Sequence, residues 1–226
     1  MSRKTQAYPA PPAPSRRYTT GEEIANTVTH GIGALLSVAA LVTLLLLARE
    51  NGDLWRIAGF TIYGISLFTL YLASSLYHAV TGEKLKKIFR MLDHSSIYLL
   101  IAGTYTPILL IAMRGTWGWT LFVLIWTMAA AGLVYKFIFL DRSEWVSLAI
   151  YIAMGWLAII AIKPMLAMLP AGLLLWIVFG GLLYTGGIVF YVWKRIPFNH
   201  AIWHLFVLGG STLHFVGILL YLTPIA

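Results

Sequence analysis

The chain has 226 residues, of which 60% are hydrophobic and only 11% are charged. A soluble domain carries about 25% charged residues, so this composition excludes an ordinary soluble protein and indicates an integral membrane protein. The net charge of +8 does not indicate a nucleic-acid partner, because the Lys and Arg residues lie between apolar segments, where anionic lipid and topology explain them. The chain has no cysteine, which leaves His and carboxylates as ligands for a transition metal.

Seven apolar segments follow a polar, Pro-rich stretch at residues 1–21, which lacks the residues to form a core and is expected to be a disordered tail. Each segment is long enough to cross about 30 Å of hydrocarbon as a helix. We therefore predict an all-α integral membrane protein in which residues 22–226 form a seven-transmembrane helix bundle. The segments cover residues 24–48, 54–80, 92–113, 116–139, 145–167, 171–193 and 200–222.

The distribution of basic residues predicts the orientation of the bundle. The tail and the loops after the second, fourth and sixth segments hold twelve of the sixteen Lys and Arg residues, and the opposite loops hold the other four. Because Lys and Arg are enriched in cytoplasmic loops, the N-terminus is expected in the cytoplasm and the C-terminus outside. The four residues on the opposite side are Arg49, Arg56, Arg114 and Lys163.

The first segment begins with a polar strip formed by Glu23, Asn26 and His30. These residues are three and four positions apart, so a helix presents them on one face. Two interpretations stay open. The strip forms hydrogen bonds to a metal shell from outside, or it joins two helices by polar contacts within the bundle.

The second segment ends with Ser74 and His78, and the third begins with Asp93 and His94. Ser74 lies one helical turn from His78, on the same face. Asp93 is interpreted as a proton-handling group, or alternatively as a helix cap or an ion-pair partner of a nearby basic residue. Ser74 is either part of that site or a small residue that allows close helix contact. His94 points about 100° away from Asp93 and is expected to serve packing or headgroup contact.

The last segment opens with His200 and His204, whose i, i+4 spacing places both imidazoles about 6 Å apart on one helix face. Catalytic zinc commonly takes three protein ligands and leaves a fourth position for water, and His78, at the same predicted depth, is the best third ligand. Zinc is favoured, although imidazole also binds iron, copper and nickel. The alternative to a metal site is that His200 and His204 lie at the membrane interface and form hydrogen bonds to lipid headgroups or to the backbone. His214 lies about 15 Å deeper and cannot share that ion.

The sequence also contains four spaced motifs, and together they resemble the hemolysin III family, the bacterial relatives of the progestin and adipoQ receptors. The resemblance covers the chain from about Glu22 to its C-terminus. It is strengthened by the stretches at residues 97–107 and 194–204. The motifs are Glu23-x-x-Asn26-x-x-Thr29-His30, Ser74-x-x-x-His78, Phe89-x-x-x-Asp93-His94 and His200-x-x-x-His204.

This resemblance implies a multi-pass protein of the bacterial inner membrane with zinc near the cytoplasmic face. It maps the zinc ligands to His78, His200 and His204, and it places Ser74 and Asp93 close to the zinc-bound water. The wider group includes alkaline ceramidases, which implies amide hydrolysis on a lipid. The expected partners are therefore membrane lipids and a lipid-like substrate, and the oligomeric state stays open.

Three functions follow from these features. The first is zinc-dependent hydrolysis of a lipid amide or ester, in which Asp93 moves the proton and Ser74 steadies the water or the oxyanion. The alternative is a non-enzymatic, zinc-containing sensor or regulator of membrane energetics or lipid homeostasis. The third is a channel-forming cytolysin, which is disfavoured because the segments carry few charges to line a wide aqueous pore.

Overall fold

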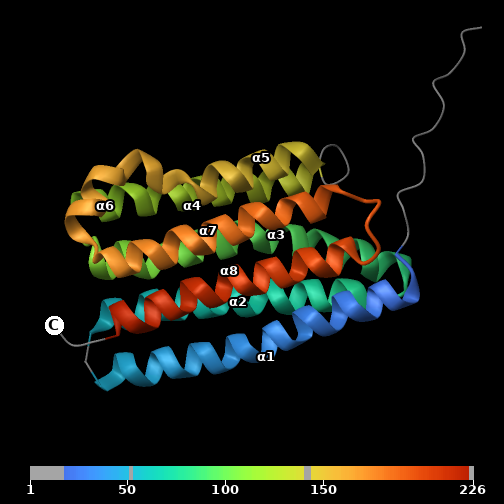
Figure 1. The fold of residues 1–226 in the computed structure, drawn as a ribbon, viewed down its shortest axis with the longest axis horizontal. Coiled ribbons are helices and arrows are strands. Elements are labelled where there is room, and N and C mark those ends of the chain that lie inside the picture. The colour runs from blue at the N-terminus through green and yellow to red at the C-terminus, as the bar shows by residue number, and fades with distance from the viewer. Residues whose placement is uncertain (1–17, 51–52, 140–143, 224–226) are drawn as a thin grey trace, which may run out of the picture.

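The computed structural model describes residues 18–50, 53–139 and 144–223 (Figure 1). Residues 1–17, which make up most of the predicted tail, lie outside the described residues. The described part of the chain is helical and contains no strand. It holds seven helical segments that are long and apolar enough to cross a membrane, as predicted.

Five of these spans are single helices, and the third and fifth are composite. The third joins α3 (Glu83–Pro107) to a π-helical turn, η1 (Ile108–Ala112). The fifth joins α5 (Glu144–Gly155), the 3₁₀ segment η2 (Leu157–Ala161) and α6 (Ile162–Met168). The single-helix spans are α1 (Thr20–Glu50), α2 (Leu54–Ala79), α4 (Thr116–Phe139), α7 (Ala171–Val192) and α8 (Asn199–Leu222).

The third span differs from its predicted bounds at its start. We predicted residues 92–113, whereas α3 begins at Glu83. Residues 83–91 contain three Lys and one each of Arg, Glu, Leu and Met, which favour helix, but the stretch is not apolar enough to resemble a membrane segment. At its other end, the α-helical pattern stops at Pro107, because proline lacks the N–H that would donate to the carbonyl four residues earlier.

The fifth span, predicted as one helix, is interrupted after Gly155. Tyr105 on α3 compensates for the interruption, because its hydroxyl donates to the Gly155 carbonyl at 3.0 Å and accepts from the Ala158 N–H at 3.0 Å. Broken helices are tolerated at membrane depth only where such partners satisfy the freed backbone groups. A phenol from a neighbouring helix therefore stabilises an irregularity that the local sequence does not reveal.

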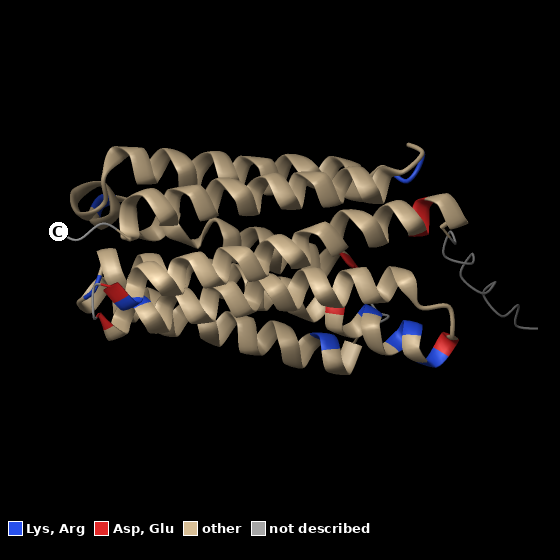
Figure 2. Cartoon of the chain, turned by 90° about the horizontal axis from the view of Figure 1, so that it is seen from below, with Lys and Arg blue, Asp and Glu red and all other residues tan. Residues whose placement is uncertain are grey.

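The packing of the helices brings four helix ends together. α2 packs against α1 and α3, and α8 packs against α1 and α7, so that α1, α2 and α8 lie side by side (Figure 1). The first turns of α1, α3 and α8 and the last turn of α2 meet at one end of the bundle, which we call the site end. Lys, Arg, Asp and Glu gather toward the two ends, and most of the middle of the bundle is free of them (Figure 2).

Close contact between α7 and α8 depends on Gly187. A Cβ atom at this position would lie 2.6 Å from Phe206 Cβ and 2.9 Å from Trp203 Cε3, whereas a Cβ on Gly186 would meet its nearest atom at 3.9 Å. We therefore expect Gly187→Ala to destabilise the bundle by about 1–3 kcal/mol through overpacking. Thermal unfolding in detergent checks this, and Gly186→Ala is the matched control. Equal melting temperatures for the two variants would contradict the expected packing.

Candidate metal centre

The three histidines predicted as metal ligands meet at the site end. Each of His78, His200 and His204 offers a nitrogen that lies within 4.8 Å of those of the other two. Their side chains are buried, with residue exposures of 3%, 8% and 1%, respectively. His78 comes from the last turn of α2, and the other two come from the first two turns of α8. The packing of α2 beside α8 thus assembles one group from two distant parts of the chain.

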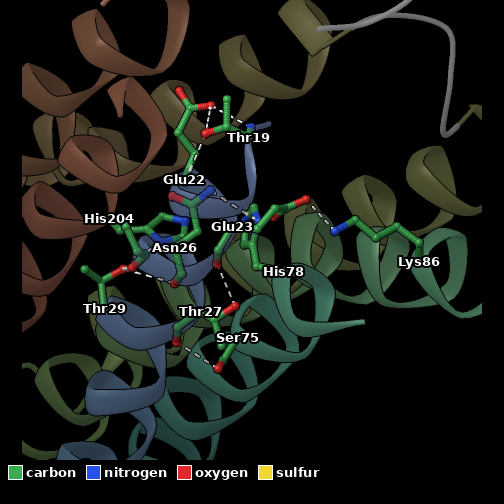
Figure 3. A network of polar contacts seen from close by, with 11 residues as sticks. Thr19, Glu22, Glu23, Asn26, Thr27, Thr29, Ser75, His78, Lys86 and His204 are labelled. Carbon is green, nitrogen blue, oxygen red and sulfur yellow. Dashed lines mark hydrogen bonds and ion pairs between the residues drawn. The ribbon is translucent and has the colours of Figure 1, made fainter. Parts of the chain in front are cut away.

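Helix α1 orients the His78 ring. Nδ1 of His78 donates to Glu23 Oε2 at 2.6 Å, and the amide of Asn26 lies 3.3 Å from the same nitrogen (Figure 3). The other carboxylate oxygen of Glu23 accepts from Lys86 on α3 at 2.7 Å. With Nδ1 used in this way, Nε2 of His78 presents its lone pair to the centre of the histidine group.

Helix α1 also fixes His204. The Thr29 hydroxyl donates to the Ala25 carbonyl at 2.8 Å, so its oxygen accepts from His204 Nδ1, which lies 3.1 Å away. The ring of His30 stacks on that of His204, with centroids 3.5 Å apart and an angle of 11° between the planes. The predicted polar strip of α1 therefore lies directly behind two of the three histidines.

The histidine group fits a metal ion by its donor chemistry. Among the described residues, Nε2 of His78 and Nδ1 of His200 are buried and have no hydrogen-bond partner. A buried nitrogen without a partner is costly, whereas three converging imidazoles are a common ligand set for zinc. Metal-bound histidines typically donate their second ring nitrogen to a carboxylate, carbonyl or hydroxyl, as His78 and His204 do here.

Asp93 and Ser74 lie beside the histidine group. Both are buried, with exposures of 8% and 1%, and Ser74 Oγ has no hydrogen-bond partner among the described residues. Both line the same cavity as His200 and His204. The structure groups the three predicted ligands with Glu23, Asn26 and His30 in contact with them, and it places Ser74 and Asp93 in the lining of the cavity that His200 and His204 also line.

Two cavities meet at the histidine group. The first, of about 160 Å³, lies within the bundle and is lined mostly by apolar side chains of α3, α5, α7 and α8. The second, of about 1090 Å³, is a polar vestibule at the site end, lined in part by Lys86, Lys87 and Arg90. His204 lines the apolar cavity, His78 lines the vestibule, and His200 lines both. A ligand with an apolar chain and a polar head therefore has room on both sides of the group.

The structure leaves His94 and His214 outside the metal-ligating group, as predicted. His94 lines both cavities, and its backbone carbonyl accepts a hydrogen bond from Tyr151 at 2.7 Å. The Nε2 atom of His214 lies 3.1 Å from the Ile177 carbonyl on α7. Because a carbonyl only accepts, this contact sets His214 as a donor within the bundle.

Sequence reasoning did not single out Glu22 as a site residue. Its carboxylate accepts from the Thr19 N–H at 2.8 Å and from the Phe198 N–H at 3.2 Å. Phe198 has a φ of 55° and directly precedes α8, so Glu22 ties the first turn of α1 to the start of the helix that carries His200. The partners are 176 residues apart, and no local pattern reveals the contact.

The Glu23 contact predicts a specific loss on substitution. We expect Glu23→Gln to lower zinc affinity about 10- to 100-fold, because the amide is a weaker acceptor for His78 Nδ1 than the carboxylate is. Competition with a fluorescent zinc chelator measures the affinity. Glu83→Gln is the control, since Glu83 is an exposed acid that also lines the vestibule. Unchanged affinity in Glu23→Gln would exclude this role.

The chain is similar to known proteins over most of its length. The family described as Haemolysin-III related matches residues 18–215. The chain is 51% identical to Hemolysin-3 of Bacillus cereus, over 91% of this chain and 94% of that protein. It is 35% identical to the human Monocyte to macrophage differentiation factor, over 90% of this chain and 86% of that protein. No solved structure matches the chain.

Proposed function

The chain belongs to the hemolysin III family, and from the histidine site that it carries we propose that it is a zinc-binding membrane hydrolase. The proposed substrate is a lipid amide or ester. The observation that carries this proposal is the group of three buried histidines, two of which, His200 and His204, line an apolar cavity together with Asp93. An apolar cavity accommodates the chain of a lipid, and the histidine group lies where the polar linkage of that lipid would rest.

Each site residue has a role in the proposed reaction. Zinc held by His78, His200 and His204 would supply a Lewis acid and lower the pKa of a coordinated water to about 7. Asp93 accepts the proton of the attacking water and returns it to the leaving nitrogen or oxygen. Ser74 donates a hydrogen bond to the carbonyl oxygen as negative charge develops there. Glu23 and Thr29 hold the rings of two of the ligating histidines in place.

We also propose that the N-terminus is cytoplasmic and that the site end faces the cytoplasm from the inner membrane. The excess of Lys and Arg in the tail and in the loops at that end supports this orientation. It places the vestibule in contact with the cytoplasm and the apolar cavity within the bilayer. The proposed partners are membrane lipids, and none of these features favours nucleic acid.

The test of this proposal is release of fatty acid from defined lipids. The zinc-loaded chain in nanodiscs is incubated with a panel of lipid amides and esters, and mass spectrometry detects the acid. We expect zinc-dependent release that is lost in His200→Ala. If zinc is bound and none of the lipids is hydrolysed, the site is better explained by the alternative, a non-enzymatic sensor or regulator.

A further inference from the structure

Tyr18 packs against two of the three histidines on the side of the vestibule. Its ring centroid lies 5.7 Å from that of His78 and 5.2 Å from that of His200. It lines the vestibule together with these two histidines, whereas His204 lies beyond them in the lining of the apolar cavity. The Tyr18 ring therefore lies next to both of the histidines that border the vestibule.

The residues next to Tyr18 are held firmly. Both the N–H and the hydroxyl of Thr19 donate to Glu22 Oε2, at 2.8 and 3.1 Å, and the Thr19 hydroxyl accepts from the Glu22 N–H. The second oxygen of Glu22 accepts from Phe198 at the start of α8. Tyr18 thus directly precedes a set of hydrogen bonds that connects α1 to the start of α8.

The chemistry of Tyr18 suits a barrier better than a metal ligand. A tyrosine phenol ordinarily ionises only near pH 10. The group is therefore neutral at physiological pH, and it presents a ring rather than a phenolate to the site. An uncharged ring over two imidazoles hinders charged or strongly hydrated molecules while the apolar cavity on the other side stays available.

We propose that Tyr18 is a barrier residue that closes the histidine group against the vestibule, so that the polar linkage of an amphiphile reaches the group from the apolar cavity. This inference deepens the proposed function and rests on the proposed metal site, but it does not require hydrolysis. It assigns to Tyr18 the selection of membrane-dissolved molecules over water-soluble ones.

The first test is the rate at which a charged, water-soluble chromophoric chelator removes zinc from the full chain in nanodiscs. We expect Tyr18→Ala to lose zinc at least about tenfold faster than the wild type, one power of ten corresponding to about 1.4 kcal/mol in the barrier. Tyr18→Phe keeps the ring and should match the wild type. Trp193→Ala removes an aromatic residue that is 53% exposed in the loop before α8, and it should also match. Equal rates in Tyr18→Ala and the wild type would overturn the barrier.

A second test needs neither zinc nor turnover. The chain has no cysteine, so Ser74→Cys introduces a single thiol behind the histidine group, in the lining of the apolar cavity. A charged methanethiosulfonate reagent should label this thiol slowly when Tyr18 is present and at least about tenfold faster with Tyr18→Ala. Similar labelling rates would refute the barrier even if zinc binding and hydrolysis were established. If Tyr18→Ala speeds labelling but the chain hydrolyses no lipid, the barrier is supported. In that case only the proposed hydrolysis is contradicted.

Discussion

Replacing His78, His200 or His204 by Ala is expected to abolish stoichiometric zinc binding. Zinc sites of four ligands bind with about 10–16 kcal/mol, so one ligand contributes roughly 3 kcal/mol. Since 1.4 kcal/mol is a factor of ten, each substitution should weaken binding about 10²- to 10³-fold. Zinc remaining after dialysis against a weak chelator measures the loss for each variant.

His214→Ala is the matched control for these variants. His214 is also a histidine of α8, but its Nε2 contacts the Ile177 carbonyl and it does not belong to the metal-ligating group. The His214→Ala variant should retain as much zinc as the wild type. If His214→Ala lost zinc as readily as His204→Ala, the loss would reflect damage to the bundle rather than removal of a ligand.

Asp93→Asn is expected to keep zinc and lower hydrolysis about 10²- to 10⁴-fold, the usual contribution of a general acid–base residue. The asparagine preserves the size of the buried side chain and its position beside Ser74, but it cannot accept the proton of the attacking water. Initial rates of fatty-acid release, measured with zinc content on the same samples, separate the two effects.

Glu144→Gln is the comparison for Asp93→Asn. Glu144 lines the same cavity but is exposed at the start of α5, and the proposed reaction gives it no role. Its substitution should change the rate little. If Asp93→Asn retained both zinc and full activity, the proton-transfer role of Asp93 would be contradicted. If it lost zinc, Asp93 would instead be a residue that supports the metal site.

The fold and most of the candidate site could be predicted because they depend on regular helices. The seven spans follow from the lengths of the apolar segments. The i, i+4 spacing of His200 and His204 places both side chains on one face of a helix. His78 could be placed beside them because the end of the second span and the start of the seventh lie at the same depth in the membrane. The sequence did not reveal which nitrogen faces the centre, since that depends on Glu23 and Thr29 across helix contacts.

The features that prediction missed arise where the backbone is irregular or where the contact joins distant segments. Tyr18 lies before the first helix, so helical periodicity gives no position for its ring. The bond from Phe198 to Glu22 depends on the left-handed backbone at Phe198. The interruption after Gly155 is stabilised by Tyr105, about fifty residues earlier on another helix. The stacking of His30 on His204 likewise follows from the distance between α1 and α8.

The most direct test of the metal centre is elemental mass spectrometry of the full chain, purified in detergent without added metal or chelator. The chain has no cysteine, so a retained transition metal is not held by thiolate ligands. We predict about one zinc per chain, the occupancy expected for a single three-histidine site. A wild-type protein that carries no stoichiometric metal would contradict the metal centre and the hydrolytic reaction built on it. The three histidines would then act as a buried packing or proton-responsive cluster.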